Sequence, residues 1–135
     1  MTTTGRCLCG EVTWEYDGEP NWVAHCHCES CRRNCSAAIV TFVGVPREAF
    51  RHTGAEPKVF ESSPGVRRPF CGNCGSPVAY DADSYPHEIH LYAAGHADPA
   101  ALKPQAHVFH AEALPWLPVE DGLRRFEKGG EGGVG

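Results

Sequence analysis

The chain has 135 residues, of which 41% are hydrophobic and 21% charged, a composition typical of one globular domain. Its formal net charge is −5 with histidines neutral, and the pI is about 5.9. Because non-specific nucleic-acid affinity rests on clustered Lys and Arg, this acidic balance argues against a nucleic-acid partner.

The N-terminal residues, MTTTGRCLCG, show no apolar core of a secretory signal, and the longest nearly apolar run, 37–46, is too short to span a membrane. We therefore expect no membrane partner and a cytoplasmic location, where thiols stay reduced. Eight cysteines in such a compartment indicate metal ligands rather than four disulfides.

Taken in chain order, most segments resemble short strands. Val12, Trp14 and Tyr16 alternate with polar residues, which predicts a strand with one buried face. Further strands are expected at 22–24, 38–45, 58–61, 78–80, 89–93 and 107–109. Single helical turns are expected at 46–50 and, capped by Asp98, at 98–102. The pattern predicts a mainly β fold with short helical turns.

No linker or repeat divides the chain, so residues 1–128 are expected to form a single domain. The tail 129–135, GGEGGVG, offers too little side chain to bury and is expected to be disordered.

Four cysteines form two pairs, each followed by a glycine. Cys7 and Cys9 would share one face of a strand, and the C-x-x-C-G turn at Cys71 and Cys74 directs two thiolates at one point. Two such pairs make a closed tetrahedral site with four thiolates. Such a site predicts structural zinc, because no position remains for substrate.

Three further cysteines lie in the motif HCHCESCRR at 25–33. Cys26, Cys28 and Cys31 would give a metal three protein ligands and one open position, the arrangement of catalytic zinc. Arg32 and Arg33 could offset the negative charge of the thiolates, or they could be ordinary surface charges.

Cys35 leaves two alternatives open. If the segment after Cys31 is helical, Cys35 lies on the same face and could close the second site as a fourth ligand. Otherwise it packs as a small apolar side chain. His25 and His27 are less favoured as ligands, because three cysteines are already within reach.

Four motifs, in order, resemble the glutathione-dependent formaldehyde-activating enzyme family. These are GRCLCGEVTWE, HCHCESCRR, FCGNCGSPVAY and HVFHAEALPWLPVEDGLRRFEK, which together extend from Gly5 to Lys128. Cys35 and the LRR at 123–125, where a proline often follows the leucine, depart from the family pattern.

The resemblance implies a β-tent fold of small antiparallel sheets held by two zinc ions per chain. It implies that one zinc is structural and the other catalytic. The structural ligands would be Cys7, Cys9, Cys71 and Cys74. The catalytic ligands would be Cys26, Cys28 and Cys31. The implied reaction condenses formaldehyde with glutathione to S-hydroxymethylglutathione, so the expected partners are a small thiol and an aldehyde.

The leading hypothesis is therefore a carbon–sulfur lyase or synthase in which the second zinc takes up the thiolate of glutathione. The proton donor is not identified by any motif. Histidines that qualify by residue type are His87, His90, His96, His107 and His110. Tyr80 and Tyr85 are further candidates of the same kind. Trp14, Trp22 and Trp116 are expected in the core, although Trp116 could line a pocket mouth.

Three other classes compete with this hypothesis. A binding module could use both zinc ions structurally, and Cys35 as a fourth ligand would favour it. A thiol–disulfide or sulfoxide reductase would need a metal-free C-x-x-C pair with a low thiol pKa. A nucleic-acid-binding zinc ribbon is opposed by the net charge.

Overall fold

The computed structural model describes residues 1–129. Of the tail predicted to be disordered, residues 130–135 lie outside this described part. The strands are β1 (Thr2–Arg6), β2 (Thr13–Asp17), β3 (Trp22–Cys26), β4 (Val40–Pro46), β5 (Phe50–His52), β6 (Lys58–Ser63), β7 (Val66–Phe70), β8 (Ala79–Ala82), β9 (Glu88–Tyr92), β10 (Ala106–Val108) and β11 (Arg124–Arg125). The helical segments are α1 (Glu29–Cys35) and the 3₁₀ helices η1 (Arg47–Ala49), η2 (Ala93–Gly95), η3 (Pro99–Ala101) and η4 (His110–Glu112).

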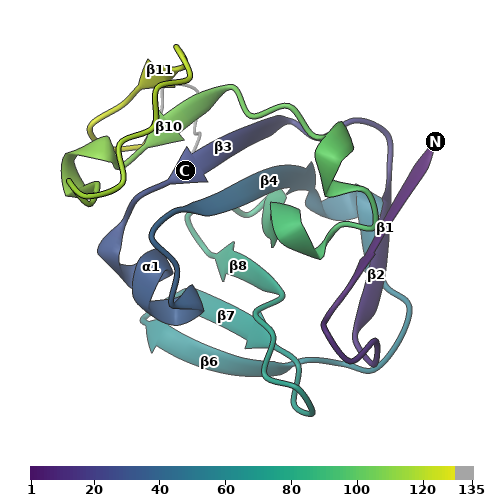
Figure 1. The fold of residues 1–135 in the computed structure, drawn as a ribbon. Coiled ribbons are helices and arrows are strands. Elements are labelled where there is room, and N and C mark those ends of the chain that lie inside the picture. Colours follow the sequence, from purple (N-terminus) through teal and green to yellow (C-terminus); the bar gives the residue numbers. More distant parts are fainter. Residues whose placement is uncertain (130–135) are drawn as a thin grey trace.

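The strands form two sheets, so the predicted mainly β fold is confirmed. A three-stranded sheet has the order β1-β2-β5, and a larger sheet has the order β11-β10-β3-β4-β9-β8-β7-β6. The pairs are antiparallel except that β10 runs parallel to both β3 and β11. Figure 1 shows the β1–β2 hairpin at one side of the larger sheet and α1 at the other.

The middle strands of the larger sheet bury both faces, because successive side chains point to opposite sides. On one face Val23, Val43 and Leu91 pack with Trp14 of the hairpin, and we call this the hairpin face. On the other, Phe42 and further aromatic residues pack with cysteines of α1, and we call this the helix face. Residues that follow one another in β3 therefore enter different environments.

Two glycines permit close approach of tryptophan rings. A Cβ at Gly44 would lie 2.2 Å from the ring of Trp22, and a Cβ at Gly5 would lie 2.1 Å from the ring of Trp14. No larger residue fits at either position without moving the ring. Trp14 and Trp22 are buried, as predicted. Trp116 is 70% exposed, so its predicted place in the core is wrong.

The strands predicted at the six later segments all have counterparts in the structure, within a few residues at their ends. The helical turns at η1 and η3 are also confirmed, although the Asp98 side chain makes no capping hydrogen bond. Four strands, β1, β5, β7 and β11, were not predicted. β1 is mostly threonine and β7 contains Arg67, Arg68 and Pro69, so neither shows apolar alternation. In residues 1–129 no helix has the length and apolar character needed to cross a membrane.

Candidate metal centres

The first cysteine group joins two loops that are far apart in the sequence. The Sγ atoms of Cys7, Cys9, Cys71 and Cys74 all lie within 4.8 Å of one another. The distance from Cys9 Sγ is 3.6 Å to Cys7 Sγ and 3.7 Å to Cys71 Sγ. Ligands about 2.3 Å from a tetrahedral zinc ion are separated by about 3.8 Å, so these thiols fit the metal that their softness favours.

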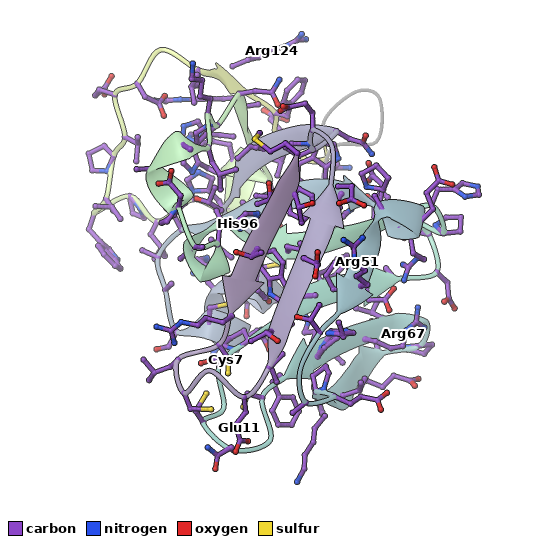
Figure 2. The ribbon with its side chains drawn as sticks, turned by 90° about the vertical axis from the view of Figure 1, so that its right-hand side faces the viewer. Cys7, Glu11, Arg51, Arg67, His96 and Arg124 are labelled. Carbon is purple, nitrogen blue, oxygen red and sulfur yellow. The ribbon has the colours of Figure 1, made fainter. Side chains whose placement is uncertain are left out.

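Tight turns aim these thiols, as predicted for Cys71 and Cys74 but not for the other pair. Cys7 and Cys9 lie in the turn after β1 rather than within a strand, because Gly10 with φ +85° closes the hairpin there. Gly75, with φ +78°, completes the second turn. Figure 2 shows Cys7 at one end of the β1–β2 hairpin, with Arg124 at the far end of the molecule.

Backbone amides and one hydroxyl stabilise the thiolates of this group. The amide of Val12 donates to Cys7 Sγ at 3.3 Å, and the amide of Cys74 donates to Cys71 Sγ at 3.4 Å. The Ser76 hydroxyl lies 3.1 Å from Cys74 Sγ. Its hydrogen bond, together with backbone hydrogen bonds, lowers the pKa of Cys74 to about 5. The group is therefore prepared to carry negative charge.

The second cysteine group lies within one short segment. Cys26 ends β3, Cys28 is the N-cap residue of α1, and Cys31 lies in its first turn. Their three Sγ atoms lie within 4.8 Å of one another, and the amide of Cys31 donates to Cys28 Sγ at 3.4 Å. Cys26 and Cys31 are buried, whereas Cys28 is partly exposed. Any open coordination position is therefore reached past Cys28.

The three thiols are too close to ionise together without a cation. Hydrogen bonds from Cys26 and Cys31 lower the pKa of Cys28 to about 2, and the hydrogen bonds to Cys28 and Cys31 raise the pKa of Cys26. The Cys28 thiolate thus accepts hydrogen bonds from the neutral thiols of Cys26 and Cys31. A divalent cation would relieve this competition and allow all three to be ionised.

A buried arginine that the sequence motif does not contain faces this group. Arg68 of β7 is 6% exposed, and its Nη1 donates to Cys31 Sγ at 3.7 Å. Its guanidinium lies 5.1 Å from the ring centroid of Tyr80, and its Nε donates to Ser62 Oγ at 3.0 Å. The suggested charge partners are otherwise engaged, since Arg32 donates to backbone carbonyls and Arg33 pairs with Glu29 at the surface.

Cys35 ends α1 and packs beside the second group without joining it. The segment after Cys31 is helical, yet the cysteines drawn together there are only Cys26, Cys28 and Cys31 among the residues the structure describes. The Cys35 thiol is hydrogen-bonded to the Tyr92 hydroxyl, and burial raises its pKa. The structure thus favours Cys35 as a partly buried packing residue.

The candidate histidines lie in three places. His90 is on the helix face between Trp22 and Tyr80, with Nε2 3.2 Å from Glu88. His96 accepts from the Tyr16 hydroxyl on the hairpin side at 2.9 Å, and His87 is exposed. His107 and His110 gather with His25 and His27 beside β10.

A groove of about 1200 Å³ includes Cys7 of the first cysteine group in its lining. The lining also includes His25 and Thr41 on the hairpin face, Cys35 at the end of α1 and Tyr92 at the end of β9. None of the three thiols of the second group lines it. Because Tyr92 and Cys35 pack in the same cluster as Cys31, the groove borders the cluster that contains the second group.

Together, the sheets and the two groups define a mainly β protein that could hold two metal ions through cysteine. The family model described as glutathione-dependent formaldehyde-activating enzyme matches residues 2–112. The chain belongs to this family.

Two individual proteins are also similar. An uncharacterized lyase of Schizosaccharomyces pombe is 30% identical over 90 residues. The alignment covers 65% of this chain and 65% of that protein, slightly less than two thirds of its length. A crystal structure of a Rhodobacter sphaeroides protein superposes with a TM-score of 0.58 and 19% identity, covering 91% of this chain and 98% of the other. This second likeness concerns the fold.

Proposed function

We propose that the protein is a zinc-dependent carbon–sulfur lyase or synthase acting on an adduct of glutathione and an aldehyde. Its reaction would be the formation of S-hydroxymethylglutathione from formaldehyde and glutathione, or its reversal. The observation that carries the proposal is the group of three thiols, open at Cys28 and faced by Arg68. Family membership and the lyase among its relatives support it.

The three cysteines and Arg68 would prepare the site for a fourth sulfur ligand. Three thiolates around a divalent zinc carry one negative charge, which the Arg68 guanidinium offsets. An incoming thiolate therefore meets a nearly neutral site rather than an anionic one. Zinc bound there would lower the pKa of a coordinated thiol, so that a thiolate is present at neutral pH.

Tyr80 is the proton donor that we propose for the alkoxide formed when the sulfur attacks formaldehyde. Burial raises the pKa of Tyr80, and the charges of Cys31 and Cys28 act in the same direction. The hydroxyl therefore stays protonated at neutral pH and can donate. Tyr92, which packs in one cluster with Cys31, is already hydrogen-bonded to Asn34 and Cys35.

The groove would hold the peptide part of glutathione. Its lining includes Cys35 and Tyr92, which pack in one cluster with Cys31, and its volume suits a tripeptide. The thiol would then enter from the exposed side of Cys28.

Exchange between formaldehyde and glutathione, followed by NMR with and without zinc-loaded protein, tests the proposal. We expect acceleration by the native protein and none by Cys28→Ser, which removes the most accessible ligand. Arg67→Met is the matched control and should stay active. It changes the arginine that precedes Arg68 and forms ion pairs with Asp81 and Asp83. No acceleration by fully loaded native protein would refute the named reaction.

The alternative function is a binding module in which both zinc ions are structural. Cys35 is the observation that favours it, because it packs in one cluster with Cys31 and could reach the metal after a change of side-chain conformation. The number of sulfur ligands at the second zinc separates the two functions.

A further inference from the structure

We propose a third metal site, distinct from both cysteine groups, formed by His25, His107 and Asp121. It would take a divalent transition-metal ion such as Zn²⁺. The three side chains each offer one ligand atom, and these atoms lie within 4.8 Å of one another. Two imidazoles and one carboxylate are a ligand set that such ions accept.

Strand pairing brings these residues together from distant parts of the sequence. β10 lies parallel to β3 with His107 directly opposite His25. Their ring centroids are 4.9 Å apart. Asp121 lies in the segment that leads to β11, and its Oδ2 is 2.8 Å from His107 Nε2. His107 is 1% exposed, and both of its ring nitrogens lie within hydrogen-bond distance of a side chain.

Each proposed ligand has an outer partner that fixes its orientation. His25 Nδ1 lies 2.7 Å from Thr41 Oγ1, which leaves Nε2 for an ion. His107 Nδ1 lies 2.8 Å from His27 Nε2, so Nε2 of His107 faces Asp121. The second carboxylate oxygen of Asp121 accepts from the amide of Leu123 at 3.0 Å. Histidine ligands in metal sites are held in this way by a bond to the other ring nitrogen.

The site is separate from the second cysteine group, although Cys26 follows His25 directly. Successive side chains of β3 point to opposite faces, so the His25 ring lies on the hairpin face with Thr41, and Cys26 on the helix face. Nitrogen and oxygen ligands also distinguish this site from the thiolate groups in a spectrum.

The competing explanation is a hydrogen bond between His107 and Asp121 that only fastens the C-terminal segment to β10. That hydrogen bond does not involve His25, whereas an ion bound by all three residues requires the His25 imidazole as a ligand. His25 is partly exposed, so His25→Gln can be made without opening the core. Asp121→Asn keeps an oxygen for Leu123 and removes the charge that an ion needs.

The test uses full-length protein whose cysteine groups are saturated with two equivalents of Zn²⁺, titrated with Co²⁺. We expect one further equivalent to bind with the absorption of nitrogen and oxygen ligands and without sulfur-to-cobalt charge transfer. His25→Gln and Asp121→Asn should each weaken this binding by more than about tenfold, and Thr41→Val by about tenfold.

His87→Gln, which changes an exposed histidine far from β10 in the sheet order, is the matched control and should bind as the native protein does. The proposal is overturned if the native protein binds no third ion. It is equally overturned if His25→Gln binds the ion as tightly as His87→Gln does.

Discussion

Arg68 is the residue that most clearly distinguishes the second cysteine group from the first. The first group is stabilised by backbone amides and the Ser76 hydroxyl, whereas the second has one amide and a buried guanidinium. A permanent charge beside a metal site changes the charge that the site can accept. The affinity of the second group for zinc should therefore depend on Arg68.

Replacing Arg68 with methionine tests this dependence. We expect the zinc affinity of the second group to fall about 10- to 100-fold, because the thiolates lose the cation that faces them, while the first group keeps its zinc. Competition with a chelator, followed by counting the zinc that remains, measures both. Arg67→Met serves again as control, and equal affinities in the two variants would contradict the role assigned to Arg68.

Tyr80→Phe tests the proposed proton donor. The reaction rate should fall about 10²- to 10⁴-fold, as is usual when a positioned acid is removed, while both zinc ions are retained. Tyr16→Phe removes a buried hydroxyl on the opposite side of the sheet and should cost only about 1 kcal/mol of stability. Unchanged turnover in Tyr80→Phe would assign the proton to another group.

At the residue scale, the sequence predicted which cysteines lie together, but not the residues that surround them. Short spacings such as that of Cys26, Cys28 and Cys31 fix local geometry, because few residues separate the ligands. Arg68 lies in β7, which pairs with β6 and β8, and its contact with Cys31 joins residues that are 37 apart in the sequence. Local motifs carry no information on such a contact, so the sequence offered only the adjacent Arg32 and Arg33, as charge partners or as ordinary surface charges.

Among the elements, β7, β8 and η1 are joined by one carboxylate. Asp81 accepts from Arg47 at 2.6 Å and from Arg67 at 3.3 Å. Burial alone would raise the pKa of Asp81, but the hydrogen bonds from the two arginines outweigh it and hold the pKa below its usual value. The folded state is therefore stabilised by the ionised form.

Asp81→Asn should lower the free energy of unfolding by about 1–2 kcal/mol at neutral pH. This value allows for solvent screening, which weakens the ion pairs because both arginines are partly exposed. Because the folded-state pKa is depressed, this difference is fully present above the unfolded pKa. It should disappear as pH falls through the folded one. Denaturant unfolding of both proteins between neutral and acidic pH measures it.

Asp83→Asn is the control, because the Asp83 side chain is 72% exposed and should contribute less than about 0.5 kcal/mol. A difference between Asp81→Asn and the native protein that is constant across pH would rule out the ionic explanation.

Strands with an apolar pattern of their own were predicted, and β1 and β7, which lack one, were not. β2, β4 and β9 alternate or contain β-branched apolar runs, which mark strands in any context. β1 and β7 become strands through their neighbours. The parallel pairing of β3 with β10 likewise has no local signature, which is why the proximity of His25 and His107 was not foreseen.

For the whole molecule, the two cysteine groups should contribute unequally to stability. Cys9 and Cys71 are 62 residues apart, so the first group connects the hairpin to the β7–β8 loop. The second spans only residues 26–31, from the end of β3 to the first turn of α1. Closing a long loop restricts the unfolded chain more than closing a short one does.

Cys71→Ser should therefore lower the free energy of unfolding by more than about 4 kcal/mol, and Cys28→Ser by less than about 2 kcal/mol. Thermal unfolding of each variant, with its zinc content measured on the same sample, gives the comparison. If Cys28→Ser destabilised the protein as much as Cys71→Ser, the second site would be structural.

The measurement that tests the open second site most directly is zinc X-ray absorption, recorded on the protein with two zinc ions before and after glutathione is added. An average of about 3.5 sulfur ligands per zinc, rising to about 4, is the result we expect from one closed and one open site. An average of about 4 from the start, unchanged by glutathione, would mean that Cys35 closes the second site. Such a result would contradict an open catalytic zinc.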